Sequence, residues 1–143
     1  MCDADGPEDT GFGLRFIEGR VSNAYLQRAA IQPGYSVVVW TRPHVVEPTE
    51  LAPTDAAAYW ADVLDAGRAI EAHFQPIKMN YETLGNALPH LHTHVMPRYA
   101  DDPRPGLPFP FPEGVVGALP EEEFVSAVES LRRLAKPLLD SPV

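Results

Sequence analysis

Cysteine is nearly absent from this chain of 143 residues, which contains a single one, Cys2. One cysteine cannot close a disulfide within the chain, and it excludes a zinc site built on several cysteines. Such usage is compatible with a reducing cytoplasm, where we expect the protein to reside. Long apolar runs are also missing, and a membrane-spanning helix needs about 20 consecutive apolar residues. We therefore expect no membrane partner.

Positive charge is scarce as well. The chain has 11 lysines and arginines against 20 acidic residues, a formal net charge of −9. A protein that binds the backbone of a nucleic acid needs a basic face, so we expect no nucleic-acid polymer as a partner. The charge of a cleft can oppose that of the whole molecule, so a small anionic substrate is compatible with the composition.

The length fits one domain with a modest core. The acidic start lacks the apolar stretch of a signal peptide, and we expect residues 1–12 to form a disordered lead-in. No internal repeat or linker divides the remainder. We expect the main domain at residues 13–112 and a C-terminal helix within residues 113–143 that packs on or beside it.

The spacing of apolar residues predicts strands, then a helix, then strands, then a second helix. The second helix opens at Pro120, which suits a first helical position, is followed by three acids that suit the positive end of the helix dipole, and ends before Pro137. Short links between strands favour antiparallel pairing with helices packed on the sheet, which is an α+β fold. The expected strands are 14–17, 21–27, 35–40, 77–81 and 91–99, and the first helix is expected at about 54–74.

Three of the five histidines occupy alternate positions in the run His90-Leu91-His92-Thr93-His94. On a strand these imidazoles share one face, while the residues between them point to the other. Such a face has three possible roles: a hydrogen-bonded polar surface, a metal site or a site of phosphoryl chemistry. A metal site is compatible with imidazole, which binds zinc, copper and nickel. For phosphoryl chemistry, an imidazole with its ordinary pKa of about 6.5 is largely neutral and nucleophilic at pH 7.

The surroundings of the triplet favour phosphoryl chemistry. Gly85 allows close approach of the backbone to an anion, and the Asn86 amide can donate to a phosphate oxygen or a leaving group. Arg98 has the same strand parity as the histidines, so its guanidinium would bind phosphate there, or else be a surface group at the strand end. We expect a structural role for His44 and no chemical role for His73.

The run from His90 to Met96, followed by Pro97-Arg98-Tyr99, resembles the signature of the histidine triad (HIT) family. The segment 79–89 is similar to a bacterial branch related to fragile-histidine-triad and diadenosine-polyphosphate hydrolases. The resemblance spans about residues 14–105. It implies a five-stranded antiparallel sheet with one long central helix and a C-terminal helix, a catalytic domain at 13–112, and a homodimer with a continuous sheet.

The resemblance also implies a mechanism. His92 attacks the α-phosphorus of a nucleotide, and water or another phosphate then resolves the nucleotidyl-histidine intermediate. The flanking His90 and His94 would bind non-bridging oxygens and hold the tautomer of the nucleophile. The chemistry as such needs no metal or other cofactor. The remaining implied residues are Asn86 on the catalytic side, and Gln27, Asn80, Gly85 and Arg98 for substrate binding.

Four positions depart from the family pattern. Gln27 stands where Asp or Asn is usual, Tyr35 where a histidine often follows the Pro-Gly turn, and Ala87 where Ser or Thr is common. Thr93 is polar where the signature is apolar. These departures affect the identity of the substrate more than catalysis. The leading hypothesis is cleavage of a dinucleoside polyphosphate or a nucleoside phosphoramidate. Its alternatives are a nucleotide sensor or interaction protein with weak turnover, and a metal-dependent hydrolase that uses the triad as ligands.

Overall fold

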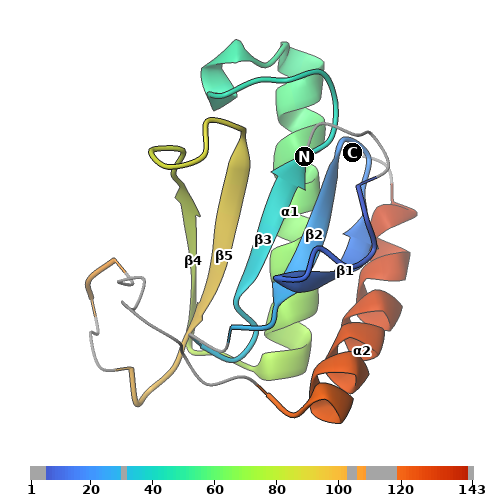
Figure 1. The fold of residues 1–143 in the computed structure, drawn as a ribbon, viewed down its shortest axis with the longest axis vertical. Coiled ribbons are helices and arrows are strands. Elements are labelled where there is room, and N and C mark those ends of the chain that lie inside the picture. The colour runs from blue at the N-terminus through green and yellow to red at the C-terminus, as the bar shows by residue number, and fades with distance from the viewer. Residues whose placement is uncertain (1–5, 30–31, 103–105, 109–118, 142–143) are drawn as a thin grey trace.

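The computed structural model describes residues 6–29, 32–102, 106–108 and 119–141 (Figure 1). Five strands form one sheet in the order β1-β2-β3-β5-β4, and every neighbouring pair is antiparallel. The predicted α+β fold with a five-stranded antiparallel sheet is confirmed. The strands are β1 Gly13–Glu18, β2 Ser22–Gln27, β3 Ser36–Trp40, β4 Lys78–Thr83 and β5 His92–Arg98.

Both long helices cover the same face of the sheet. In Figure 1, α1 (Pro53–Phe74) lies behind the middle of the sheet and α2 (Glu121–Leu139) lies beside it, behind β1. Strand alternation supplies the core, because Val38 and Trp40 of β3 are buried with α1 while Val37 and Val39 face the other way. Phe124 of α2 belongs to the same core cluster. Neither α1 nor α2 packs on the opposite face of the sheet, to which Val37 and Val39 point.

A buried carboxylate fastens the β1–β2 turn to α1. Asp62 is 1% exposed and accepts hydrogen bonds from the backbone N–H groups of Arg20, Val21 and Ser22, from the Ser22 hydroxyl and from the Arg20 guanidinium, at 2.9–3.1 Å. The turn is tight, because a Cβ at Gly19 would lie 2.6 Å from the Asp62 carboxyl carbon. The sheet is thereby held at a fixed position on the helix.

Most element boundaries differ from those predicted by one to three residues, and two of these differences have a clear physical cause. Strand β5 begins at His92, because the N–H of Leu91 donates to the carbonyl of Val45, outside the ladder, at 2.9 Å. His90 therefore precedes the strand. Helix α2 does not stop before Pro137 but continues to Leu139, and this proline lies in its last turn. Within the described residues, neither helix combines the length and the apolar character needed to span a membrane.

The structure describes only part of the two terminal segments predicted from the sequence, the lead-in at residues 1–12 and the C-terminal segment at residues 113–143. Residues 1–5 and 113–118 lie outside the described residues. Residues 6–12, which the sequence assigned to the lead-in, lie against the sheet: Asp9 forms an isolated bridge with Leu14, and the Glu8 carboxylate is 2.6 Å from the guanidinium of Arg132 on α2. Composition alone does not indicate the second contact, since Glu8 and Arg132 are 124 residues apart in the chain.

Candidate active site

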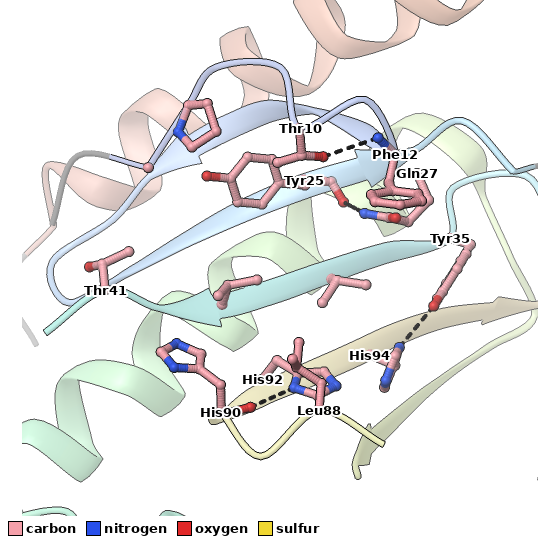
Figure 2. Close-up of a pocket in the computed structure, with 14 residues that line it drawn as sticks. Thr10, Phe12, Tyr25, Gln27, Tyr35, Thr41, Leu88, His90, His92 and His94 are labelled. Atoms are coloured by element: carbon pink, nitrogen blue, oxygen red, sulfur yellow. Dashed lines mark hydrogen bonds between the residues drawn. The ribbon is translucent and has the colours of Figure 1, made fainter. Parts of the chain in front are cut away.

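A cleft with a cavity of about 420 Å³ lies on the sheet face opposite the helices (Figure 2). This volume is within the usual range of small-molecule sites, about 300–1,000 Å³. Its floor follows the register of the sheet: Tyr25 pairs with Val37, which pairs with His94, and Val39 pairs with His92. Leu88 lines one side of the cleft, and residues from the segment 6–12 line the other.

His92 has a defined tautomer. Its Nδ1 lies 2.6 Å from the backbone carbonyl oxygen of His90. A carbonyl can only accept, so Nδ1 carries the proton and donates it. The other nitrogen of the neutral ring, Nε2, then has its lone pair available. This is the state that a nucleophilic imidazole needs.

His90 lines the cleft, but its ring nitrogens form their bonds within the protein. It is 3% exposed, and its Nε2 lies 2.8 Å from the carbonyl oxygen of Trp40, so Nε2 is the donor. Its Nδ1 lies 3.2 Å from Nδ1 of His44. Both ring nitrogens thus have partners within the protein, and the His90 carbonyl accepts the hydrogen bond that His92 Nδ1–H donates. The resemblance implies that His90 binds phosphate oxygens, and this role stays a prediction.

His44 was expected to be structural, and the structure places it against the triad. Its ring centroid is 5.4 Å from that of His90. The contact arises because the segment after β3 returns beside the segment before β5, where the N–H of Trp40 also donates to the carbonyl of Leu91 at 3.1 Å. The order Arg42-Pro43-His44 after a strand was visible in the sequence, but its neighbour follows only from the β3–β5 pairing.

His94 is held by Tyr35. The Tyr35 hydroxyl lies 2.8 Å from Nδ1 of His94, and the two rings are stacked. Burial, followed by the charge of Glu82, raises the pKa of Tyr35, so the hydroxyl keeps its proton. Burial and then the neighbouring His92 lower the pKa of His94 to about 4. A protonated hydroxyl beside a neutral imidazole can donate to Nδ1, and in that tautomer the proton of His94 is on Nε2.

Thr93, the polar residue within the signature, points away from the cleft. It is fully buried, and its hydroxyl lies 2.8 Å from the hydroxyls of both Tyr59 on α1 and Thr83 on β4. These hydrogen bonds satisfy the polar atom in the core, which explains why a threonine is tolerated where the pattern is apolar. The departure at this position therefore leaves the face that carries the imidazoles unchanged.

The model of the HIT domain matches residues 14–101, more than half of the chain. The chain belongs to the HIT family. Solved HIT structures agree with its fold: a histidine triad protein from Sinorhizobium meliloti is 24% identical, with 86% of this chain and 90% of that chain covered and a TM-score of 0.76. A histidine triad protein from Bradyrhizobium japonicum is 25% identical, with 87% and 92% covered and a TM-score of 0.74.

A third similar structure is that of a protein described as nucleotide-binding. This hypothetical histidine triad nucleotide-binding protein from Sulfolobus tokodaii is 16% identical, and it aligns over 88% of this chain and 85% of its own with a TM-score of 0.67. At this identity the likeness shows the HIT fold alone. None of these three structures bears on the more specific resemblance to diadenosine-polyphosphate hydrolases.

Four predicted site residues of this HIT domain lie outside the cleft lining. Arg98 donates to the side-chain oxygen of Asn80 at 2.6 Å and to the carbonyl of Leu107 at 2.8 Å, and it pairs with Asp102. Asn80 and Arg98 line a separate cavity at the far end of β5. Strand parity puts Arg98 on the same face of β5 as His92, but it does not give the distance between them. Six residues of strand extend over about 20 Å, so Arg98 lies far from the triad. The other two are Gly85 and Asn86, in the loop before the triad.

The histidines and Gln27 are the predicted residues that the cleft brings together. Gln27 ends β2, and its side-chain amide donates to the carbonyl of Tyr25 at 3.2 Å. Within the described residues, no three side chains of His, Cys, Asp or Glu are grouped so that they could hold a metal ion. The arrangement that is present suits a nucleophile with one oriented nitrogen and a neutral imidazole donor beside it.

Proposed function

We propose that this HIT protein is a nucleotide hydrolase or nucleotidyl transferase that cleaves at an α-phosphate through a covalent intermediate on His92. The observation that carries the proposal is the 2.6 Å contact between His92 Nδ1 and the His90 carbonyl, which leaves Nε2 as the attacking atom. HIT domains in general are associated with nucleotide binding and with hydrolase or transferase activity, and the description of the Sulfolobus protein as nucleotide-binding is in line with that.

The proposed reaction has two displacements. The Nε2 lone pair of His92 attacks the α-phosphorus, and the bond from phosphorus to the leaving group breaks, with its electron pair going to the leaving atom, which takes up a proton. A water oxygen then attacks the same phosphorus, the P–N bond breaks, and the electron pair returns to Nε2 while the water releases a proton. A phosphate oxygen takes the place of water in the transferase reaction. Two easier steps replace one difficult displacement.

His94 supports both displacements in this proposal. With its proton on Nε2, the ring offers a donor to a non-bridging oxygen as negative charge develops there. Its lowered pKa of about 4 means that it donates as a neutral group throughout the physiological range. Gly85 and Asn86 keep their predicted role on the leaving-group side, while Asn80 and Arg98 are proposed to act from outside the cleft by supporting β4 and β5.

The lining of the cleft favours substrates with little phosphate charge. Among the described lining residues there is no Lys, Arg, Asp or Glu, and the floor presents Val37 and Val39. Glu82 pairs with His94 in the β4–β5 register, which adds a carboxylate near the triad. A polyphosphate chain would meet repulsion without a cationic partner there. We therefore propose a nucleoside phosphoramidate rather than a dinucleoside polyphosphate as the better substrate, with Gln27 near the sugar.

Turnover of adenosine phosphoramidate and of diadenosine tetraphosphate, with product identification, tests the proposal. His92→Ala should lower kcat at least ~10³-fold, because it removes the nucleophile. The matched control is His73→Ala, on the exposed end of α1, which should retain the activity of the unaltered protein. Rapid quenching and mass spectrometry should find a nucleotidyl adduct on His92. Equal turnover by the unaltered protein and His92→Ala would exclude the proposed role.

We further propose that two copies of the chain join at β4. This strand is last in the sheet order, so one of its edges has no neighbouring strand among the described residues. Tyr81 on this strand is a large aromatic residue that is 38% exposed. Light scattering after size exclusion should show a dimer that Tyr81→Glu dissociates. Leu134→Glu, at a similarly exposed position on α2, should leave it intact, and a monomeric unaltered protein would refute the proposal.

A further inference from the structure

We infer that α2 sets the substrate affinity of the cleft by holding residues 6–12, here called the N-terminal strap, in place as one of its walls. The inference rests on the proposed function, because it concerns the affinity for the same substrate. It assigns a positioning role to Arg132 and Arg28, neither of which lines the cleft.

The strap supplies four residues of the cleft lining, Gly6, Pro7, Thr10 and Phe12. Figure 2 shows the strap passing over the sheet opposite the histidines, with Phe12 beside Gln27 at one end. The Phe12 side chain lines the cleft and is 76% exposed, so its ring is accessible to a ligand. An aromatic ring at the edge of the cleft offers a flat apolar surface to a bound base.

The backbone of the strap is attached to β1 and to the end of β2. The N–H of Arg15 donates to the Glu8 carbonyl at 2.8 Å, and the N–H of Arg28 donates to the Phe12 carbonyl at 2.7 Å. The Arg15 guanidinium donates to the Gly6 carbonyl at 3.0 Å. These bonds fix where the strap runs. They do not by themselves connect it to the helical layer.

Two arginines make that connection. Arg132 on α2 donates to the Glu8 carboxylate at 2.6 Å and, through the same nitrogen, to the Arg15 carbonyl at 2.7 Å. Arg28 lies between the Asp9 carboxylate, at 2.8 Å, and the Glu121 carboxylate in the first turn of α2, at 2.6 Å. Both acidic side chains of the strap are thus paired with cations, and neither lines the cleft.

The ion pairs affect affinity in two ways. They keep the wall against the sheet, and they neutralise two carboxylates that would otherwise repel an anionic substrate. The pairs are partly exposed to solvent, so salt weakens them. The matched HIT region begins at residue 14 and ends at residue 101, so the strap and α2 lie outside it on either side. The two ends of the chain together therefore complete the substrate site.

The test compares two neighbouring arginines of α2. Arg132→Gln should raise KM for adenosine phosphoramidate about three- to tenfold with kcat within twofold of the unaltered protein. Arg133→Gln is the matched control, because Arg133 bonds to Ser130 of its own helix, and it should leave KM unchanged. The exchange of partners, Glu8→Arg with Arg132→Glu, should restore KM to within twofold, which a general weakening of α2 would not do.

Salt dependence and amide exchange give readouts that do not depend on catalysis alone. KM of the unaltered protein should rise with ionic strength more steeply than KM of Arg132→Gln, and the amides of residues 8–13 should exchange faster in that variant. If Arg132→Gln fails to fold, Glu8→Gln removes the same contact from the strap side. An unchanged KM in whichever of the two variants folds, or an equal rise in Arg133→Gln, overturns the inference. A protein that neither turns over these nucleotides nor binds AMP overturns the proposed function and this inference together.

Discussion

Replacing Tyr35 by phenylalanine tests how the site holds His94. The substitution keeps the stacked ring and removes the hydroxyl that lies 2.8 Å from His94 Nδ1. Without that donor, the proton of the neutral imidazole is no longer directed to Nε2. A larger fraction of His94 then presents a lone pair instead of an N–H to the non-bridging oxygen, and the transition state loses part of its stabilisation.

The expected size of the effect follows from one neutral hydrogen bond. Such a bond contributes about 0.5–1.5 kcal/mol net, which corresponds to roughly a two- to 13-fold change in rate, with about fivefold as the central value. The loss should appear in kcat with little change in KM, since the contact matters when charge develops on phosphorus. It should be much smaller than the loss in His92→Ala.

Steady-state turnover of adenosine phosphoramidate at pH 7 measures the effect, and nitrogen chemical shifts of His94 report its tautomer directly. Tyr81→Phe is the control, because this tyrosine of β4 lies outside the cleft lining. The reasoning is refuted if Tyr35→Phe retains full kcat while the His94 tautomer changes, since the tautomer would then be irrelevant. A loss beyond ~100-fold would also refute it, because Tyr35 would then have a direct chemical role.

Three further results are expected. The pKa of His94 is lowered to about 4, so between about pH 6.5 and 4 the unfolded chain binds a proton at this residue that the native protein does not bind. The free energy of unfolding, measured by urea unfolding at each pH, should therefore fall as the pH is lowered across that window. The fall should exceed that of His94→Asn by about 1–2 kcal/mol, a figure that includes solvent screening. Asp62→Asn should cost about 3–5 kcal/mol in the same assay because it turns a buried acceptor of several N–H and O–H groups partly into a donor, whereas Asp101→Asn on the surface should cost less than about 0.5 kcal/mol. Finally, kcat/KM should be at least about tenfold higher for adenosine phosphoramidate than for diadenosine tetraphosphate, and a preference for the tetraphosphate would show that the lining does not select by charge.

The sequence predicts this fold well because its local signals agree with one another. The β-branched run of β3, the helical spacing of α1 and the acidic start of α2 each specify an element without reference to distant residues. Alternation along β5 also predicted that His92 and His94 share a face, and the structure lines the cleft with both. Periodicity is a local property, so it can be obtained from sequence alone.

The remaining features depend on contacts between distant segments. His44 contacts His90 only because β3 pairs with β5. Arg98 lies outside the cleft and bonds to Asn80, which strand parity does not predict because it gives the face of a residue but not its position along the strand. The strap looks disordered by composition because its acidic side chains have their partners elsewhere: Glu8 and Arg132 are 124 residues apart in the chain. An ion pair of that separation has no signature in a local window of sequence.

The group that orients the nucleophile belongs to the main chain. A side-chain substitution at position 90 leaves this carbonyl in place. Its direction is set by two backbone bonds, from the N–H of His90 to the carbonyl of Leu88 and from the N–H of Leu91 to the carbonyl of Val45. A scan that replaces side chains one at a time would therefore register His92 as essential while leaving its orienting partner undetected. Selection on that feature would be visible instead as intolerance of insertions and deletions in the segments 41–46 and 84–91, where a one-residue shift would turn a different carbonyl toward the imidazole.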